Sequence, residues 1–449
     1  MNHFIPKTMN KIENEDVLVK GKEGYKETKL GWIPEDWSLP TIDEVFEFLK
    51  TTSFSRNQLN YDDDNAIYYI HYGDIHSTYK TPILDFEEVQ SVPKLNNDVQ
   101  LPASVQYLKD GDVIIADASE DYEGVGTAIE LQNLEDKKVV SGLHTFALRD
   151  KEELTAKGFR TYIFKNPIVK KALKTIATGS KVFGISKGNV QKFKIVLPTF
   201  PEQQKIATIL NTWDKAIAAQ EKLIVEKQEL KKGLMQRLLT GKKRFTGFEE
   251  EWEEVSLGDV CNVKGKYGIG AAAVEFSNDL PRYLRITDID DDGNYSPEKE
   301  VSVSEENWDE YVLNKGDIVF ARTGNTTGKT YLYQEKDGVL VYAGFLIKFA
   351  PNPEILNCNY LKFFTQTKQY WDWVRTMSVR SGQPGINSNE YGKLKLLLPP
   401  IEEQKKIVSL LETKENEIEK NQACVKELKK QKQGLMQQLL TGEIRVNTN

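Results

Sequence analysis

The chain has little of what enzymes commonly use for catalysis. Its 449 residues include three cysteines, widely separated and without a CxxC pair, and four histidines, at positions 3, 71, 76 and 144, without an HExxH motif. These residues predict neither a disulfide framework nor a zinc site. A GxSxG motif is also missing, as is a glycine-rich cofactor fingerprint followed by an Asn/Asp-Pro-Pro-aromatic tetrapeptide. We therefore predict no catalytic site and no metal site, and the chain does not read as a complete DNA methyltransferase.

Long apolar runs are equally scarce. The most apolar run, from Val339 to Ile347, has nine residues, against the ~18 that suggest a transmembrane helix. The first twenty residues mix charges and lack the apolar core of a signal peptide. With 28% charged and 39% hydrophobic residues, the composition is that of an ordinary globular protein. We expect a cytoplasmic protein that is not bound to a membrane.

Two segments resemble ligand-binding loops but miss the required spacing. Residues Thr323 to Thr330 have three residues between their glycines where a phosphate-binding loop needs four, and the segment that follows is strand-like. Residues Asp288 to Gly293 open like a calcium loop, but position twelve is Lys299 and Pro297 interrupts the pattern. We interpret the first segment as a hairpin turn and the second as an acidic turn.

The clearest positive signal is an internal repeat. Residues 197–242 align without a gap with residues 398–443, always 201 apart, and 19 of the 46 positions are identical. Both copies begin Leu-Pro, reach Glu-Gln four residues after that proline, and end Gly-Leu-Met-Gln-x-Leu-Leu-Thr-Gly. A period of about 200 residues is far longer than the ~20–50 of a solenoid unit. The repeat therefore predicts a duplicated module, a globular segment followed by a long helix.

The repeat continues into the globular segments with shifting offsets. Short β-branched and aromatic runs bounded by Gly, Asp and Pro predict strands and turns there. The matched pairs are Trp37 with Trp252, Tyr69 to Ile75 with Tyr283 to Ile289, and Leu108 to Ala116 with Leu313 to Ala321. Helical stretches are predicted at about 159–177 and 357–377, each followed by a Gly-rich loop and a strand, FKIVLP or LKLLLP.

These patterns predict an α+β protein with two similar globular α/β domains separated by two long antiparallel helices, an intramolecular coiled coil with a pseudo-twofold internal repeat. The predicted parts are an N-terminal extension (1–24), a first domain (25–200), a central helix (201–241), a second domain (242–400) and a C-terminal helix (401–442).

Apolar residues recur along each helix at spacings of three and four for about five heptads, which is the seam of a coiled coil. At ~1.5 Å per residue, each helix would span roughly 57 Å. Because one chain already holds two matched seams, we favour an intramolecular pair over a homodimeric coiled coil. The predicted seam residues are Ile206, Leu210, Ile217, Ile224, Leu234, Leu238, Ile407, Leu411, Ile418, Val425, Leu435 and Leu439.

The charge distribution suggests a surface for phosphates despite a net charge of −7. Residues 165–194 contain eight lysines and no Asp or Glu, and residues 355–395 contain six Lys or Arg against two acids. Two basic strips at matched positions favour a phosphate-contacting surface over a solvated helix face. They could equally face a partner protein.

The duplicated helix motif resembles that of the specificity subunit of type I restriction–modification enzymes. The phrase from Leu30 to Trp37, and SGQPGIN at Ser381 to Asn387 before LLLPP, are similar to the same family, and the resemblance covers nearly the whole chain from about Tyr25. The first copy departs from the pattern at residues 180–186, SKVFGIS, which leaves Gln383 without a counterpart.

The resemblance implies two target-recognition domains, each reading half of a split double-stranded DNA sequence. It implies that the helices dock two adenine-methyltransferase subunits, which restriction/translocase subunits then join. S-adenosylmethionine, ATP and Mg would be bound by those partners, with no cofactor on this chain. Two related domains also suit half-sites about one helical turn, ~34–36 Å, apart. A coiled-coil adaptor that binds only proteins is the alternative; a standalone methyltransferase or NTPase is disfavoured.

The candidate DNA contacts follow from side-chain chemistry. Lysines suit phosphate contacts, whereas the planar fork of Arg322 and the donor and acceptor of Gln383 suit base edges. The full set of candidates is Lys181, Lys187, Lys192, Arg322, Lys329, Arg380, Gln383, Lys393 and Lys395.

Overall fold

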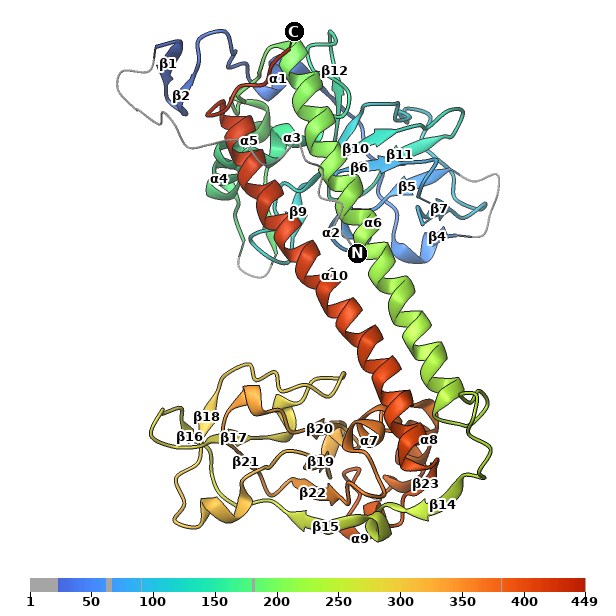
Figure 1. The fold of residues 1–449 in the computed structure, drawn as a ribbon. Helices are drawn as coiled ribbons and strands as arrows, with labels where there is room; N and C mark the ends of the chain where they lie inside the picture. The colour runs from blue at the N-terminus through green and yellow to red at the C-terminus, as the bar shows by residue number, and fades with distance from the viewer. Residues whose placement is uncertain (1–22, 62–66, 90, 180–181, 381, 449) are drawn as a thin grey trace. The chain divides into compact units, whose positions relative to one another are not determined.

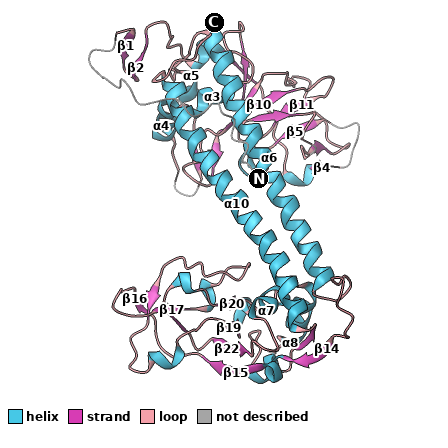
Figure 2. Ribbon diagram, viewed as in Figure 1, coloured by secondary structure: helices cyan, strands magenta, loops and turns pink. Residues whose placement is uncertain are grey.

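The computed structural model describes residues 23–61, 67–89, 91–179, 182–380 and 382–448. The chain divides into two compact units, Met1–Glu221 with Ala423–Asn449, and Lys222–Gln422. Each unit contains one globular segment and part of both long helices (Figure 1). Figure 2 shows that short strands joined by long loops make up most of each globular segment.

The first unit contains two main sheets. The larger has the order β3 (Phe46–Leu49), β12 (Thr145–Asp150), β8 (Val113–Ala116), β10 (Ala128–Gln132) and β6 (Ile83–Asp85). The smaller has the order β11 (Val139–Ser141), β5 (Tyr68–Ile70), β7 (Lys94–Leu95) and β4 (Leu59–Asn60). Two short ribbons pair β1 (Tyr25–Thr28) with β2 (Gly31–Pro34), and β9 (Ala118–Ser119) with β13 (Phe183–Gly184).

The second unit repeats this arrangement. One sheet has the order β15 (Cys261–Tyr267), β22 (Leu346–Pro351), β19 (Ile318–Ala321) and β20 (Thr330–Leu332). The other has the order β16 (Val274–Glu275), β18 (Val301–Ser302), β17 (Arg282–Leu284) and β21 (Leu340–Tyr342). A further ribbon pairs β14 (Glu253–Ser256) with β23 (Lys395–Leu398).

The two units share one sheet topology. Strands β3-β12-β8-β10 correspond in order to β15-β22-β19-β20, and β11-β5-β7-β4 to β21-β17-β18-β16. The terminal pair is parallel in each smaller sheet, β11 with β5 and β21 with β17. The internal repeat predicted from the sequence is therefore a repeat of the fold.

The predicted helical stretches are present, each divided into two helices. They are α3 (Arg160–Lys165) with α4 (Pro167–Ile176), and α7 (Cys358–Phe364) with α8 (Lys368–Met377). The divisions occur at capping residues, because the Asn166 side chain accepts from the Ile168 backbone nitrogen and the Thr367 side chain from that of Tyr370. Shorter helices are α1 (Ile42–Val45), α2 (Tyr72–Ser77), α5 (Lys187–Gln191) and α9 (Ser388–Gly392).

One predicted strand is wrong in the first unit. The segment FKIVLP, residues 193–198, forms two isolated bridges, Thr41 with Lys194 and Ser38 with Leu197, whereas LKLLLP contains the continuous strand β23. The partner segment of the first copy contains Pro40, which has no backbone N–H to give to a ladder. The turn between β19 and β20 does form the predicted hairpin, around a short 3-10 turn at Gly324–Thr326.

The long helices α6 (Phe200–Leu238) and α10 (Ile401–Thr441) form part of the core of both globular segments. In the first unit, Ile206 and Leu439 belong to the same buried cluster as the sheet residues Val113 and Leu148. In the second unit, Leu238 and Ile407 belong to the cluster around Phe320 and Phe349. Residues of both long helices are thus part of the hydrophobic core of each globular segment.

Within each unit the two helices run antiparallel. Glu221 pairs with Lys429 at 2.6 Å in the first unit, and Lys227 pairs with Glu417 at 2.8 Å in the second. As the residue number rises along α6, that of its partner in α10 falls. The structure places ten of the twelve proposed seam residues at 9% exposure or less, with Leu234 and Leu435 partly buried against the same clusters.

Candidate nucleic-acid interface

The glutamine of the repeated Glu-Gln pair holds each long helix to its globular segment. The Gln203 amide oxygen accepts a hydrogen bond from the Ala156 backbone nitrogen at 2.8 Å, and its amide nitrogen donates to the Pro198 carbonyl oxygen at 2.9 Å. Gln404 makes the two matching bonds in the second unit, both at 2.9 Å. Since both amides are buried, each bond replaces hydration that the backbone has lost.

The glutamate of the same pair joins the start of one helix to the exit of the other. In the first unit, Glu202 accepts from the indole nitrogen of Trp37 at 2.8 Å and from the Arg445 guanidinium at 2.6 Å. Burial acts to raise the pKa of Glu202, but the hydrogen bonds from Arg445 and Trp37 hold it below its ordinary value. The carboxylate therefore stays charged, and Arg445 remains bound to it.

The second unit contains the same junction. Glu403 is fully buried and accepts from the Arg244 Nε at 3.1 Å, from Arg244 Nη2 at 2.8 Å, and from the indole nitrogen of Trp252 at 3.1 Å. Glu202 and Glu403 are 201 residues apart, as are Arg445 and Arg244. We refer to these two triads as the Glu–Trp–Arg junctions.

The glycine that follows each long helix, in the repeated Thr-Gly pair, has a structural role in both copies. Gly241 and Gly442 have φ angles of 70° and 73°, the left-handed conformation that ends a helix. A Cβ at Gly442 would lie 2.6 Å from Pro34 and 3.1 Å from the Trp37 ring, and one at Gly241 would lie 3.6 Å from the Trp252 ring. The glycines therefore allow each tryptophan of a junction to pack against a helix end.

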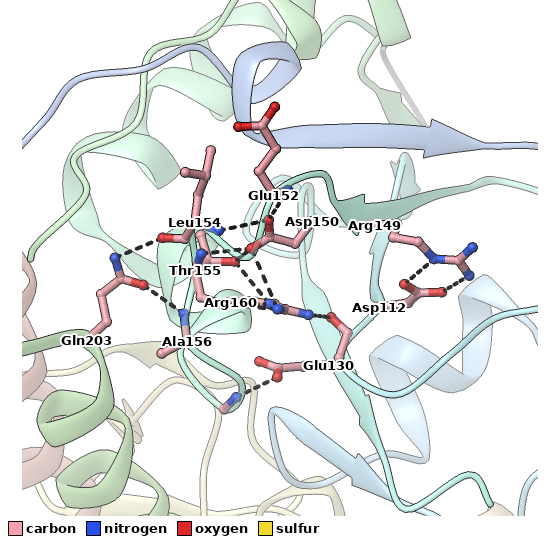
Figure 3. A network of polar contacts seen from close by, with 12 residues as sticks. Asp112, Glu130, Arg149, Asp150, Glu152, Leu154, Thr155, Ala156, Arg160 and Gln203 are labelled. Atoms are coloured by element: carbon pink, nitrogen blue, oxygen red, sulfur yellow. Dashed lines mark hydrogen bonds and ion pairs between the residues drawn. The ribbon is translucent and has the colours of Figure 1, made fainter. Parts of the chain in front are cut away.

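A buried polar network continues this attachment into the first domain (Figure 3). The Arg160 guanidinium donates to the Thr155 hydroxyl at 2.9 Å and to the Gly111 carbonyl oxygen at 2.8 Å. Glu130, fully buried beside it, accepts from the Gly158 backbone nitrogen at 2.5 Å. Burial raises the pKa of Glu130 to about 7. The network fixes the loop that presents Ala156 to Gln203.

In each domain an arginine binds a buried aspartate in the segment that follows a strand, β5 in the first domain and β17 in the second. Arg56 makes two bonds to Asp74 at 2.8 and 2.7 Å, and Arg285 makes two to Asp288 at 2.9 and 2.6 Å. Asp74 and Asp288 occupy matching positions in the sequence repeat, but the arginine comes from a different place in each domain. These arginines therefore stabilise a common scaffold in the described structure.

In the second domain, the two proposed base-reading residues lie together. The Arg322 guanidinium stacks over the Tyr267 ring, 4.9 Å from its centroid, and it makes no ion pair within the described part of the chain. The exposed Gln383 approaches Gly324, where an added Cβ would lie 2.9 Å from the Gln383 amide nitrogen. Two backbone bonds, from Gly324 to Pro384 and from Ile386 to Arg322, hold these loops side by side.

The other candidates of the second domain differ in availability. Lys329 pairs with Asp291 at 2.7 Å, and Arg380 pairs with both carboxylate oxygens of Glu390 at 2.7 and 2.6 Å. Lys395 is exposed and lies 3.6 Å from Glu254. Lys393 is exposed at the end of α9 and makes no ion pair among the described residues. Lys393 is thus the one of these four candidates without an ionic partner in the described structure, whereas Lys329, Arg380 and Lys395 each lie beside a carboxylate.

The first domain offers fewer free cations than its strip of lysines suggested. Lys187 is exposed and lies over the Phe48 ring at 5.0 Å, and Lys192 is exposed at the end of α5. Lys174 pairs with Glu123, and burial together with Lys432 lowers the pKa of Lys165 to about 8. Lys181 lies outside the described residues.

The sequence reasoning missed several residues of these sites. Arg244 and Arg445 were detectable, since they are 201 residues apart and so continue the register of the helix repeat past its glycines. Tyr267 carried no signal, because its role comes from the approach of a strand to a distant loop. Within the described ranges, no group of three or more His, Cys, Asp or Glu is placed to hold a metal, and no helix is long and apolar enough to cross a membrane.

Comparison with known proteins agrees with this architecture. The model of the type I restriction modification DNA specificity domain matches the chain twice, over residues 34–227 and 249–429. The chain therefore belongs to the family of type I restriction–modification specificity subunits.

Its relatives are distant in sequence but match over most of their length. The chain is 24% identical to a putative type I restriction enzyme MjaX specificity subunit of Methanocaldococcus jannaschii, covering 95% of this chain and 98% of the relative. It is 26% identical to the MjaVIII specificity subunit of the same organism, over 64% of this chain and 70% of the relative.

Solved structures share the fold. The S subunit of a type I restriction-modification system from M. genitalium matches with a TM-score of 0.54 at 15% identity, over 90% of this chain and 96% of that one. A chain from a study of complex assembly and conformational transition in the type I R-M system matches with a TM-score of 0.56 at 18% identity, over 92% of this chain and 99% of that one.

Proposed function

We propose that this specificity subunit reads a two-part DNA sequence, with one globular domain for each half, and performs no catalysis itself. The observation that carries the proposal is the combination of one repeated scaffold with different loop chemistry. The sheets and the Glu–Trp–Arg junctions match between the units, whereas the first domain has other residue types at the positions that correspond to Arg322 and Gln383. One scaffold with two loop sets suits two different half-sites.

We further propose that the helix pair docks two methyltransferase subunits, through which restriction/translocase subunits join. The repeated junctions would offer the same surface twice, as two copies of one partner require. Leu223 and Leu230 on α6 are seven residues apart and so lie on one face of the helix; they are 37% and 54% exposed and lie outside the proposed seam. They give the helix an apolar face for a partner. S-adenosylmethionine, ATP and Mg²⁺ would then be bound by the partner subunits.

The proposal is tested by co-expressing the full chain with a methyltransferase subunit encoded beside it and mapping methylated adenines in the host genome. We expect methylation of one gapped, two-part motif, and no methylation when either subunit is expressed alone. A complex that forms but methylates without sequence preference would support an adaptor that binds only proteins. Methylation by this chain alone would contradict the assignment of catalysis to its partners.

A further inference from the structure

The segments that leave β8 and β19 occupy the same position in the two domains. Each begins directly after an alanine that ends its strand, at Asp117 in the first domain and Arg322 in the second. Their backbone nitrogens donate, both at 3.0 Å, to the carbonyl oxygens of His144 and Phe345 respectively. Since His144 and Phe345 are themselves 201 residues apart, the repeat places Asp117 where the second domain has Arg322.

The loop that crosses these segments is also held identically. In each domain an isoleucine nitrogen donates to the carbonyl oxygen of Asp117 or Arg322 at 2.9 Å, and the glycine before that isoleucine donates back across the loop. The paired bonds are Ile185 with Asp117 and Ile386 with Arg322, then Gly184 with Thr178 and Gly385 with Ser378. Two residues before the glycine, the first domain has the exposed Val182 and the second has Gln383.

The side chains at this shared position have opposite hydrogen-bonding character. Arg322 can only donate, and it is held over the Tyr267 ring without an ion pair in the described structure. The ionised Asp117 can only accept. Its carboxylate oxygen lies 3.3 Å from the Nδ1 of His144, with side-chain exposures of 24% and 50%.

His144 is arranged to orient the Asp117 carboxylate. Its ring packs edge-on against Tyr72, with centroids 5.3 Å apart. Its φ of 56° lies in the left-handed region, which a non-glycine residue occupies at a cost and which is common at functional sites. Partial burial raises the pKa of Asp117, and the contact with His144 opposes that rise. The exposed side of the carboxylate remains available to a donor.

Building on the proposed function, we propose that Asp117, positioned by His144, reads an exocyclic amino group of the half-site bound by the first domain. The bases that carry such a group in the major groove are adenine, at N6, and cytosine, at N4. At the equivalent position Arg322 reads a guanine, whose O6 and N7 accept from its fork. The two halves of the target therefore differ in base identity at corresponding positions.

The test is methylation mapping with the full chain and its methyltransferase partners, for wild type and Asp117→Ala. We expect the variant to lose preference at one position of one half-site, an adenine or cytosine on one strand, by roughly 5- to 150-fold. The other half-site should be unchanged. Glu120→Ala removes an exposed carboxylate three residues further along the same loop, and it should leave the whole motif intact.

A second pair of variants examines His144 as a positioning residue. His144→Ala should relax the same position as Asp117→Ala, and His144→Asn, which keeps a short donor, should recover part of the preference. An unchanged motif in Asp117→Ala would overturn the inference. So would methylation that falls equally at every sequence in a variant with the melting temperature of wild type. A wild-type complex without any gapped motif would instead overturn the proposed function.

Discussion

The Glu–Trp–Arg junction of the second unit makes a quantitative prediction for Glu403→Gln. The glutamate is fully buried and accepts three hydrogen bonds, two of them from Arg244. Glutamine keeps one acceptor but turns an amide donor toward the donors of Arg244 and Trp252. The variant therefore leaves a guanidinium without its counterion and at least one donor without an acceptor.

The magnitude follows from the exposure of the arginine. Breaking a buried ion pair costs ~3–5 kcal/mol when the remaining charge stays buried. The Arg244 side chain is 25% exposed, so water can recover part of that loss. We expect Glu403→Gln to lower the local free energy of unfolding by about 2–3 kcal/mol, and Glu202→Gln to do the same in the first unit.

Hydrogen exchange read by mass spectrometry measures this locally, peptide by peptide. Protection of the first turn of α10 and of residues 244–256 should fall in Glu403→Gln, while the peptides around Glu202 should exchange as in wild type. Glu402→Gln is the matched control, because that neighbouring carboxylate is exposed and, among the described residues, pairs only with Lys405. If Glu403→Gln exchanged within about 0.5 kcal/mol of wild type at these peptides, the junction would not stabilise the fold as described.

Three further predictions concern the helix pair, the buried acid and the basic residues. Ile217→Glu should bury an unpaired carboxylate and lower the free energy of unfolding, measured by urea denaturation, by several kcal/mol. Val225→Glu, at an exposed position of the same helix, should change that free energy little; equal effects of the two variants would contradict the seam. The raised pKa of Glu130, about 7 against an ordinary 4.5, means that the folded state holds its proton more tightly. Stability should thus fall by roughly 2.5 kcal/mol as pH rises from 5 to 7.5, and Glu130→Gln should abolish that fall; a wild type whose stability is flat over this range would refute it. Lys192→Ala and Lys393→Ala should each reduce the salt dependence of DNA binding by the complex by about one unit of slope; unchanged slopes would move both lysines away from the phosphates.

Most of the architecture could be predicted from the sequence, because residues that make the same contacts in both units repeat at a constant offset. Residues that bind the helices to their domains, such as Glu202 and Gln203, must recur wherever the same junction recurs, so a constant offset of 201 revealed them. The apolar spacing along α6 and α10 similarly reports the face that each helix buries. The division of the two shorter helical stretches was missed, since a single capping residue such as Asn166 decides it.

The recognition surface was less accessible to sequence reasoning. Arg322 and Gln383 were proposed from their chemistry, but the Tyr267 ring beneath Arg322 comes from a strand far away in the chain and carries no local signal. Several lysines of the basic strips turned out to be paired internally, as Lys174 is with Glu123, and composition cannot distinguish a paired cation from a free one. The place of Asp117 became visible only through backbone bonds that match those of Arg322.

The most direct test of two independent reading domains is an exchange of one of them. Residues Trp37 to Phe193 would be replaced by the corresponding segment of a relative with a known target, and the methylated motif of the resulting complex would be mapped by sequencing. A donor segment that begins with tryptophan supplies the indole of Trp37, and with Glu202 and Arg445 unchanged the junction is preserved. We predict that one half of the motif changes to that of the donor while the other half stays the same. A motif altered in both halves, in a complex that still assembles, would contradict the central claim.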